Sequence, residues 1–320
     1  MTPEQTAWFA ETFGALVANV GKAVLGKPHT IRLAFTAMLA EGHLLLEDAP
    51  GTGKTSLARA LAATVQGTHN RIQFTPDLLP SDVTGVTIYD QSSGHFEFHK
   101  GPIFASIVLA DEINRASPKT QSALLEVMEE SHVTVDGVTH SAGRPFMVIA
   151  TQNPIEQAGT YKLPEAQLDR FLIKTSIGYP DHASTVEILA GSAERDRSSH
   201  LTPLITTDAI GDMADMAAGV HVDAAVLDYV SRLAEATRSD PQTRLGVSVR
   251  GCIALVRCAK VWAAAQGRAF VIPDDIKELA EPVLAHRLML DVEAEFAGVT
   301  NSEVLENVLS VTAPPVERVA

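Results

Sequence analysis

Residues 47–55, with the sequence EDAPGTGKT, constrain the fold of this chain more than any other segment. They follow a short apolar run over residues 43–47 and precede a helical pattern over residues 55–65. A glycine-rich loop between a strand and a helix can wrap a phosphate group, because its amide N–H groups and the helix N-terminus face the negative charge. The strict pattern has Gly at position 48, where this chain has Asp48, but the loop core is intact. The segment therefore predicts a phosphate-binding loop.

The side chains at the end of this loop suit a nucleotide and its metal ion. Lys54 supplies a cation for the β- and γ-phosphates of ATP, and Thr55 supplies a hydroxyl for Mg²⁺. A glycine-rich turn that binds nothing is the alternative, and the strand before and the helix after argue against it. The predicted nucleotide-binding residues here are Pro50, Gly51, Thr52, Gly53, Lys54, Thr55 and Ser56.

A second candidate element is the apolar run over residues 107–110, which ends in Asp111 and Glu112. In a parallel sheet, the C-terminal ends of the strands lie at the ligand-binding edge. Asp111 can hold Mg²⁺ through its water shell, and Glu112 can polarise the attacking water. An Asp-Glu pair alone is typical of a solvated turn, but its place after a strand downstream of the phosphate loop favours a catalytic role.

A third buried strand ends in the polar sequence Thr151-Gln152-Asn153-Pro154. Asn153 could orient the lytic water or contact the γ-phosphate. An Asn-Pro turn is common, so this residue alone would indicate only a turn. Beside the other two elements, we interpret Asn153 as part of the site.

The first half of the chain alternates apolar strands with helical patterns, which indicates a parallel sheet covered on both faces. The expected strands are residues 43–47, 71–74, 107–110, 146–151 and 171–177, and the expected helices are residues 55–65 and 118–131. Two hairpins interrupt this pattern. One pairs residues 86–89 with 95–98, and the other pairs 133–135 with 138–140 around Asp136-Gly137, a favoured turn pair.

After residue 181 no further strand is expected. Helical patterns cover residues 208–218, 223–237, 249–266 and 273–287. The predicted fold class is therefore α/β, with a parallel-sheet nucleotide-binding domain over residues 1–180. An all-α helical domain follows over residues 181–320.

These motifs together resemble the MoxR family, in the helix-2-insert branch of the AAA+ ATPases. The resemblance covers nearly the whole chain and is carried by residues 101–105, 110–116, 121–126, 151–154, 163–171 and 245–250. It implies a P-loop AAA+ domain followed by a helical lid. Asp48 also matches the usual form of the family's loop.

The resemblance further implies roles for two arginines. Arg170 stands at the arginine-finger position, which reaches into the nucleotide of a neighbouring subunit, and Arg250 stands at the sensor-2 position of the lid. A guanidinium stabilises charge on a transferring phosphoryl group, although most arginines form surface ion pairs. Val249 replaces the family's usual Pro before Arg250, which affects how the helix begins. Arg115 is a weaker candidate for a subunit contact.

The resemblance also implies an assembly. Members form rings, so a homo-oligomer, and a hexamer in particular, is expected, with the two hairpins facing the central channel or a partner surface. The usual partners carry a von Willebrand factor A-type domain, which this chain lacks, so that partner would be a separate protein. The expected function is Mg²⁺-dependent ATP hydrolysis that remodels or matures a protein client.

Three other functions remain open. A related motor could remodel nucleic acid, but a net charge of −14, from 39 acidic and 25 basic residues, works against binding a polyanion. A chelatase-type motor would share the same site residues. An ATP-binding switch or scaffold with little turnover would have no need of Glu112 and Arg170.

Several features predict a cytoplasmic protein with no membrane insertion. The first 14 residues contain no basic leader, and no apolar run approaches the ~20 residues that cross a bilayer. The two cysteines, Cys252 and Cys258, fall on different faces of one predicted helix, so we expect two thiols rather than a disulfide.

Overall fold

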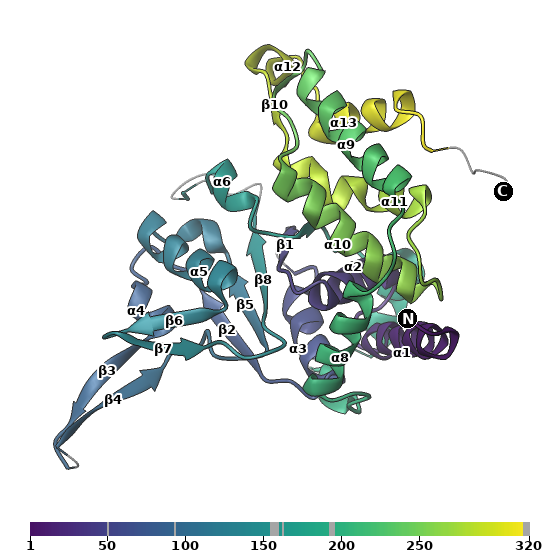
Figure 1. The fold of residues 1–320 in the computed structure, drawn as a ribbon. Coiled ribbons are helices and arrows are strands. Elements are labelled where there is room, and N and C mark those ends of the chain that lie inside the picture. The colour runs from purple at the N-terminus through teal and green to yellow at the C-terminus, as the bar shows by residue number, and fades with distance from the viewer. Residues whose placement is uncertain (50, 93, 154–159, 162, 192–195, 316–320) are drawn as a thin grey trace. The chain divides into compact units, whose positions relative to one another are not determined.

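A computed structural model describes residues 1–49, 51–92, 94–153, 160–161, 163–191 and 196–315. The chain forms two compact units (Figure 1). One comprises Ala15–Phe171 and Thr175–Asp212, and the other comprises Met1–Gly14, Leu172–Lys174 and the chain from Met213 onward. The division into domains at residue 180 stays a prediction.

The chain contains a five-stranded parallel sheet whose strand order is β2-β5-β8-β1-β9. Its strands are β1 (Leu44–Glu47), β2 (His69–Gln73), β5 (Ile107–Asp111), β8 (Met147–Gln152) and β9 (Ile173–Thr175). The expected strands are thus confirmed, with small shifts at their ends. β8 pairs in parallel with both β1 and β5, which places the C-terminal ends of these three strands at one edge.

The sheet is buried on both faces, as the continuous apolar strands predict. Leu45, Val108 and Val148 share one core with α5 (Pro118–Glu130). Alternate residues point to the other face, where α3 (Lys54–Thr64) packs against β5. Figure 1 shows α3 and α5 on opposite sides of the sheet. This layering leaves the strand ends as the accessible edge of the domain.

The remaining helices of this part of the chain are not among those that the sequence patterns predict. α1 (Pro3–Gly21) buries Phe9, Phe13, Leu16 and Val20, which recur at helical spacing. The others are α2 (Pro28–Leu39), α4 (Pro80–Thr84), η1 (Ile113–Arg115), α6 (Glu165–Leu168), α7 (His182–Ala190) and η2 (Arg197–His200).

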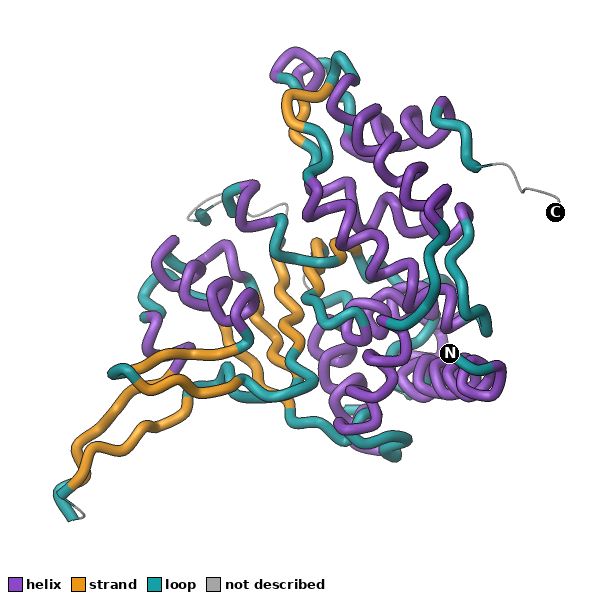
Figure 2. Tube along the Cα trace, viewed as in Figure 1, coloured by secondary structure: helices purple, strands orange, loops and turns teal. Residues whose placement is uncertain are grey.

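Both predicted hairpins are present, as β3 (Gly85–Asp90) with β4 (His95–Lys100) and β6 (His132–Val135) with β7 (Val138–Ser141). Figure 2 shows that the β3–β4 hairpin extends far beyond the sheet. Asp136 and Gly137 both have positive φ, as a two-residue hairpin turn requires. The rings of Phe98 and His140 stack at 4.1 Å between centroids, which joins β4 to β7.

The later part of the chain is mainly helical, as expected. Its elements are α8 (Thr207–Ala218), α9 (Ala224–Ser239), α10 (Val249–Ala265), α11 (Pro273–Leu284), η3 (Ala285–Arg287), α12 (Val292–Phe296) and α13 (Asn301–Val311). Leu233, Leu255, Trp262 and Leu279 lie in its core. The Trp262 indole N–H donates to Glu278 Oε2 at 2.9 Å, which satisfies the polar atom of the largest buried ring.

The expectation of no strands after residue 181 is wrong in one detail. β10 (Thr243–Leu245) and β11 (Met289–Leu290) form a short antiparallel ribbon between helices. Segments of three and two residues are too short for an alternating pattern to be recognised in the sequence. Among the described residues, no helix combines the length and the apolar character needed to cross a membrane.

Candidate nucleotide site

The phosphate loop connects β1 to α3, and its backbone explains its glycines. Gly51 and Gly53 have φ values of 85° and 95°, in the left-handed region. A Cβ atom on either residue would meet nothing within 4 Å, so the backbone conformation rather than crowding requires glycine. Gly53 is the residue immediately before α3, so this loop delivers the chain to the positive end of a helix.

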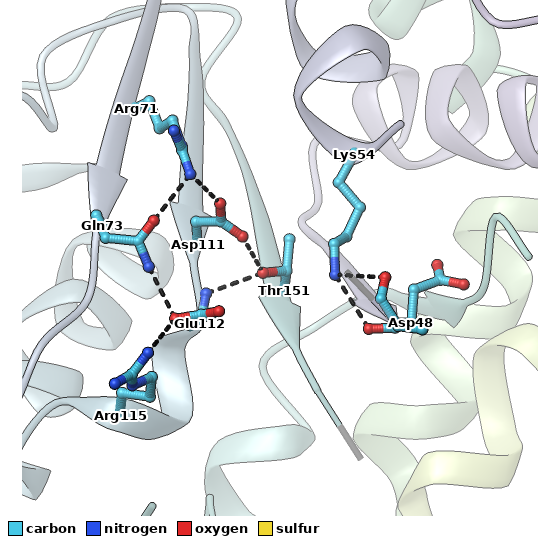
Figure 3. A network of polar contacts seen from close by, with 9 residues as sticks. Asp48, Lys54, Arg71, Gln73, Asp111, Glu112, Arg115 and Thr151 are labelled. Atoms are coloured by element: carbon cyan, nitrogen blue, oxygen red, sulfur yellow. Dashed lines mark hydrogen bonds and ion pairs between the residues drawn. The ribbon is translucent and has the colours of Figure 1, made fainter. Parts of the chain in front are cut away.

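Lys54 folds back over the loop it ends. Its Nζ donates to the carbonyl oxygens of Asp48 and Ala49 at 3.0 and 3.4 Å (Figure 3). The Thr52 hydroxyl donates to the same Ala49 carbonyl at 3.3 Å. Thr55 and Ser56 lie in the first turn of α3, and Pro50 lies outside the described residues. A phosphate in the loop would replace two neutral carbonyl partners of the ammonium group with a charged one.

Asp48, which departs from the strict glycine pattern, has a structural role in its own chain. Its carboxylate is buried and accepts the backbone N–H groups of Ile177 and Gly178 at 2.6 and 2.9 Å. Its own N–H donates to the Gln152 carbonyl at 3.3 Å, which extends the pairing of β1 with β8. Asp48 therefore joins the start of the phosphate loop to the segment that follows β9.

Asp111 ends β5 and its two oxygens are held from opposite sides. Oδ2 accepts from Arg71 Nη2 of β2 at 2.6 Å, and Oδ1 accepts from the Thr151 hydroxyl of β8 at 2.6 Å. The Asp111 side chain is 13% exposed and that of Arg71 is 47% exposed. The carboxylate is thus nearly enclosed, while its arginine partner faces solvent.

Glu112 follows directly in the left-handed conformation, with φ 57° and ψ 49°. Its backbone N–H donates to the Thr151 hydroxyl at 2.9 Å. Its Oε2 accepts from Gln73 Nε2 and from Arg115 Nη1, each at 2.9 Å. Gln73 also accepts from Arg71 at 2.8 Å, so Figure 3 shows both carboxylates within one polar network.

Asn153 directly follows β8, the strand between β1 of the phosphate loop and β5 of the two carboxylates. It is 7% exposed. The topology therefore brings the three predicted elements to the same edge of the sheet. This is the arrangement that the strand positions predict for a ligand site.

The two arginines implied by the resemblance belong to different units of the chain. Arg170 Nε is 3.1 Å from Glu129 Oε2 of α5, and its side chain is 28% exposed. Arg250 is the second residue of α10 and is exposed. Ser248 caps this helix by accepting the Gly251 N–H at 3.2 Å, so α10 begins normally without the family's proline. The roles of Asn153, Arg170 and Arg250 stay predictions.

The residues present suit Mg²⁺. The two candidate ligands are the Thr55 hydroxyl and the Asp111 carboxylate, which are hard oxygen donors of the kind that Mg²⁺ prefers. Mg²⁺ is held by few protein oxygens and by phosphate oxygens in such sites. A Cβ atom added at Gly51 or Gly53 would have no neighbouring atom within 4 Å, so the loop is not crowded at these two positions.

The sequence patterns do not by themselves indicate a role in the site for Arg71, Gln73 and Thr151. Arg71 and Gln73 are two residues apart on β2, so they share a face, and that spacing is the one signal the sequence offers. β2 pairs with β5 with Gln73 opposite Asp111, a register that depends on the folded sheet. Arg115, considered for a subunit contact, here binds Glu112 of its own chain.

Comparison with known proteins places the chain among AAA ATPases. The model of the ATPase family associated with various cellular activities (AAA) matches residues 43–173, and that of the AAA lid domain matches residues 235–308. A crystal structure from Cytophaga hutchinsonii, of a protein provisionally assigned as an ATPase, superposes with a TM-score of 0.92 at 37% identity. It covers 98% of each chain.

Two curated relatives align over most of their length. Uncharacterized protein YeaC of Bacillus subtilis (strain 168) is 47% identical, covering 96% of each chain. Chaperone MoxR1 of Mycobacterium tuberculosis (strain ATCC 25618 / H37Rv) is 39% identical over 95% of this chain and 82% of its own. The chain therefore belongs to the MoxR family of AAA+ ATPases.

Proposed function

We propose that this protein hydrolyses ATP with Mg²⁺ and uses the free energy to remodel or mature a protein client. One observation carries the proposal. The phosphate loop, the pair Asp111 and Glu112, and Asn153 follow three adjacent parallel strands and meet at one edge of the sheet. The same edge thus carries the types of residue that phosphate binding, metal binding and water activation require.

The site residues divide the reaction among them. The loop amides and Lys54 bind the phosphates, with Thr55 and Asp111 holding Mg²⁺, which when bound offsets charge on the phosphate oxygens. Glu112 orients and polarises a water molecule. The water oxygen bonds to the γ-phosphorus as the bond from that phosphorus to the β–γ bridging oxygen breaks, which yields ADP and phosphate. The proton lost by the water passes to Glu112 and then to the released phosphate.

Family membership and net charge support a proposal for the assembly and its client. We propose a homo-oligomeric ring, most simply a hexamer, in which Arg170 of one subunit completes the site of the next and Arg250 contacts nucleotide from the lid. A protein client is favoured over nucleic acid by the net charge of −14 and by the similarity to a relative named as a chaperone. A separate protein with a von Willebrand factor A-type domain is the proposed partner, in the cytoplasm.

The test is steady-state ATP hydrolysis against protein concentration, with wild type beside Glu112→Gln. We expect specific activity to rise with concentration and to vanish in the variant, while both proteins bind ATP. If ATP binds tightly but wild type releases no phosphate at any concentration, hydrolysis by the chain alone is refuted. Repeating the assay with DNA at the same salt concentration tests the nucleic-acid alternative, which predicts that DNA raises the rate of ATP hydrolysis.

A further inference from the structure

Thr151 joins the two carboxylate residues of the site through a single hydroxyl group. The hydroxyl donates to Asp111 Oδ1 at 2.6 Å and accepts the backbone N–H of Glu112 at 2.9 Å. Thr151 is fully buried, and it sits on β8 opposite Leu46 of β1. Figure 3 shows its side chain directed at both residues.

The Thr151 hydroxyl holds both the backbone turn at Glu112 and the orientation of the Asp111 carboxylate. Glu112 is left-handed, a conformation that a residue with a Cβ rarely adopts, and its N–H is held in that turn by Thr151. Asp111 is drawn in the opposite direction by Arg71, whose Nη2 lies 2.6 Å from Oδ2. Removing the hydroxyl would release the turn at Glu112 and leave Arg71 to pull the Asp111 carboxylate.

We propose that Thr151 is a positioning residue, which orients Asp111 toward the metal and Glu112 toward the lytic water. The proposal rests on the proposed ATP hydrolysis. Carboxylates at metal sites depend on such outer hydrogen bonds, and loss of one commonly costs about ten- to a hundredfold in metal affinity or activity. A displacement of the reacting groups by roughly 1 Å has a similar cost.

The experiment compares Thr151→Val, which keeps the shape of the side chain and removes its hydroxyl, with Thr151→Ser, which keeps the hydroxyl. Thr64→Val is the matched control. Thr64 is also fully buried, and its hydroxyl accepts from Asn19 at 3.0 Å at the far end of α3. Each variant is assayed for kcat, KM for ATP, thermal midpoint, and the Mg²⁺ concentration that half-saturates binding of a fluorescent ATP analogue.

For Thr151→Val we expect kcat to fall about ten- to a hundredfold, with the half-saturating Mg²⁺ concentration raised by roughly the same order and KM for ATP little changed. Thr151→Ser should recover most of both losses. Thr64→Val should lower the thermal midpoint but leave kcat and the Mg²⁺ requirement as in wild type. Thr151→Ala repeats the test if the valine variant fails to fold.

The proposal is overturned if Thr151→Val keeps wild-type kcat and Mg²⁺ dependence. It is equally overturned if Thr64→Val lowers kcat and raises the Mg²⁺ requirement as much as Thr151→Val does. It is also overturned if the serine variant recovers stability but not activity. Failure of the proposed function gives a different result, because wild type would then bind nucleotide and Mg²⁺ without releasing phosphate. The Mg²⁺ titration still tests Thr151 in that case, since it requires no turnover.

Discussion

Arg170 Nε lies 3.1 Å from Oε2 of Glu129, and both residues belong to the same chain. The two side chains are 28% and 36% exposed, so water screens the ion pair. Pairs of this kind contribute only ~0–1 kcal/mol. The guanidinium can therefore exchange Glu129 for a phosphate group at little cost, which is compatible with a contact to a neighbouring subunit's nucleotide.

Arg170→Ala tests this role. We expect the variant to bind ATP with wild-type affinity and to hydrolyse it poorly, because its own loop is intact while the neighbour's site lacks a cation. Mixing it with Glu112→Gln subunits should restore part of the activity, since each variant supplies what the other lacks. Phosphate release in titrated mixtures measures this.

The control for this mixing test is Arg232→Ala. Arg232 forms a comparable surface ion pair with Asp228 at 2.8 Å in α9. The Arg232→Ala variant should hydrolyse ATP at the wild-type rate. Mixtures of Arg170→Ala and Glu112→Gln that stay inactive at every ratio would rule out a contribution between subunits.

Lys54→Ala should abolish nucleotide binding. The ammonium group is the loop's only side-chain cation, and two carbonyl oxygens already hold it in place. Isothermal titration with ATP and Mg²⁺ measures the loss, and Lys119→Ala, at an exposed position on α5, serves as the control. Binding retained within a few-fold of wild type would show that the phosphates lie elsewhere.

Asp48→Gly, which restores the strict glycine pattern, should lower the free energy of unfolding. The change leaves the Ile177 and Gly178 N–H groups without their carboxylate acceptor. An unsatisfied buried donor such as the Ile177 N–H costs about 1–3 kcal/mol, whereas the Gly178 N–H is only partly buried and costs less. The free energy of unfolding in urea should fall accordingly, and Asp48→Asn, which keeps one acceptor oxygen, should lie between. Equal stability of glycine variant and wild type would contradict this account.

Cys258 should be inert to thiol reagents in the folded protein. Burial raises the pKa of its thiol to about 12, so almost no thiolate is present at pH 8. Burial also raises the pKa of Cys252, but that thiol is only half-buried. Mass spectrometry after alkylation at pH 8 should find Cys252 modified slowly and Cys258 modified only after denaturation. Rapid labelling of Cys258 in native protein would show that α10 opens.

Much of the fold could be predicted because its signals are local. The phosphate loop, the apolar strands and the Asp136-Gly137 hairpin each depend on residues adjacent in sequence. The helix α1 also has a local signal, since Phe9, Phe13, Leu16 and Val20 recur at helical spacing, although it is not among the predicted helices. The ribbon of β10 and β11 was not readable, because its strands exist only through their pairing with each other.

The candidate site divides in the same way. Lys54, Asp111 and Glu112 were identifiable from the strands that precede them. Arg71 and Thr151 were not, because their contacts with Asp111 arise from the register of three strands that are distant in sequence. The chemical groups of the site could thus be predicted, whereas the residues that hold them in place required the fold.

At position 112, the left-handed backbone and the proposed catalytic role favour different residues. Glycine is the residue that this conformation suits, and glycine has no carboxylate. Replacing Glu112 by Gly should therefore give a more stable protein than replacing it by Ala, by roughly 1 kcal/mol, the reverse of the usual order. The proposed role of polarising water needs a carboxylate, so it requires a side chain at a position where the backbone conformation alone favours glycine.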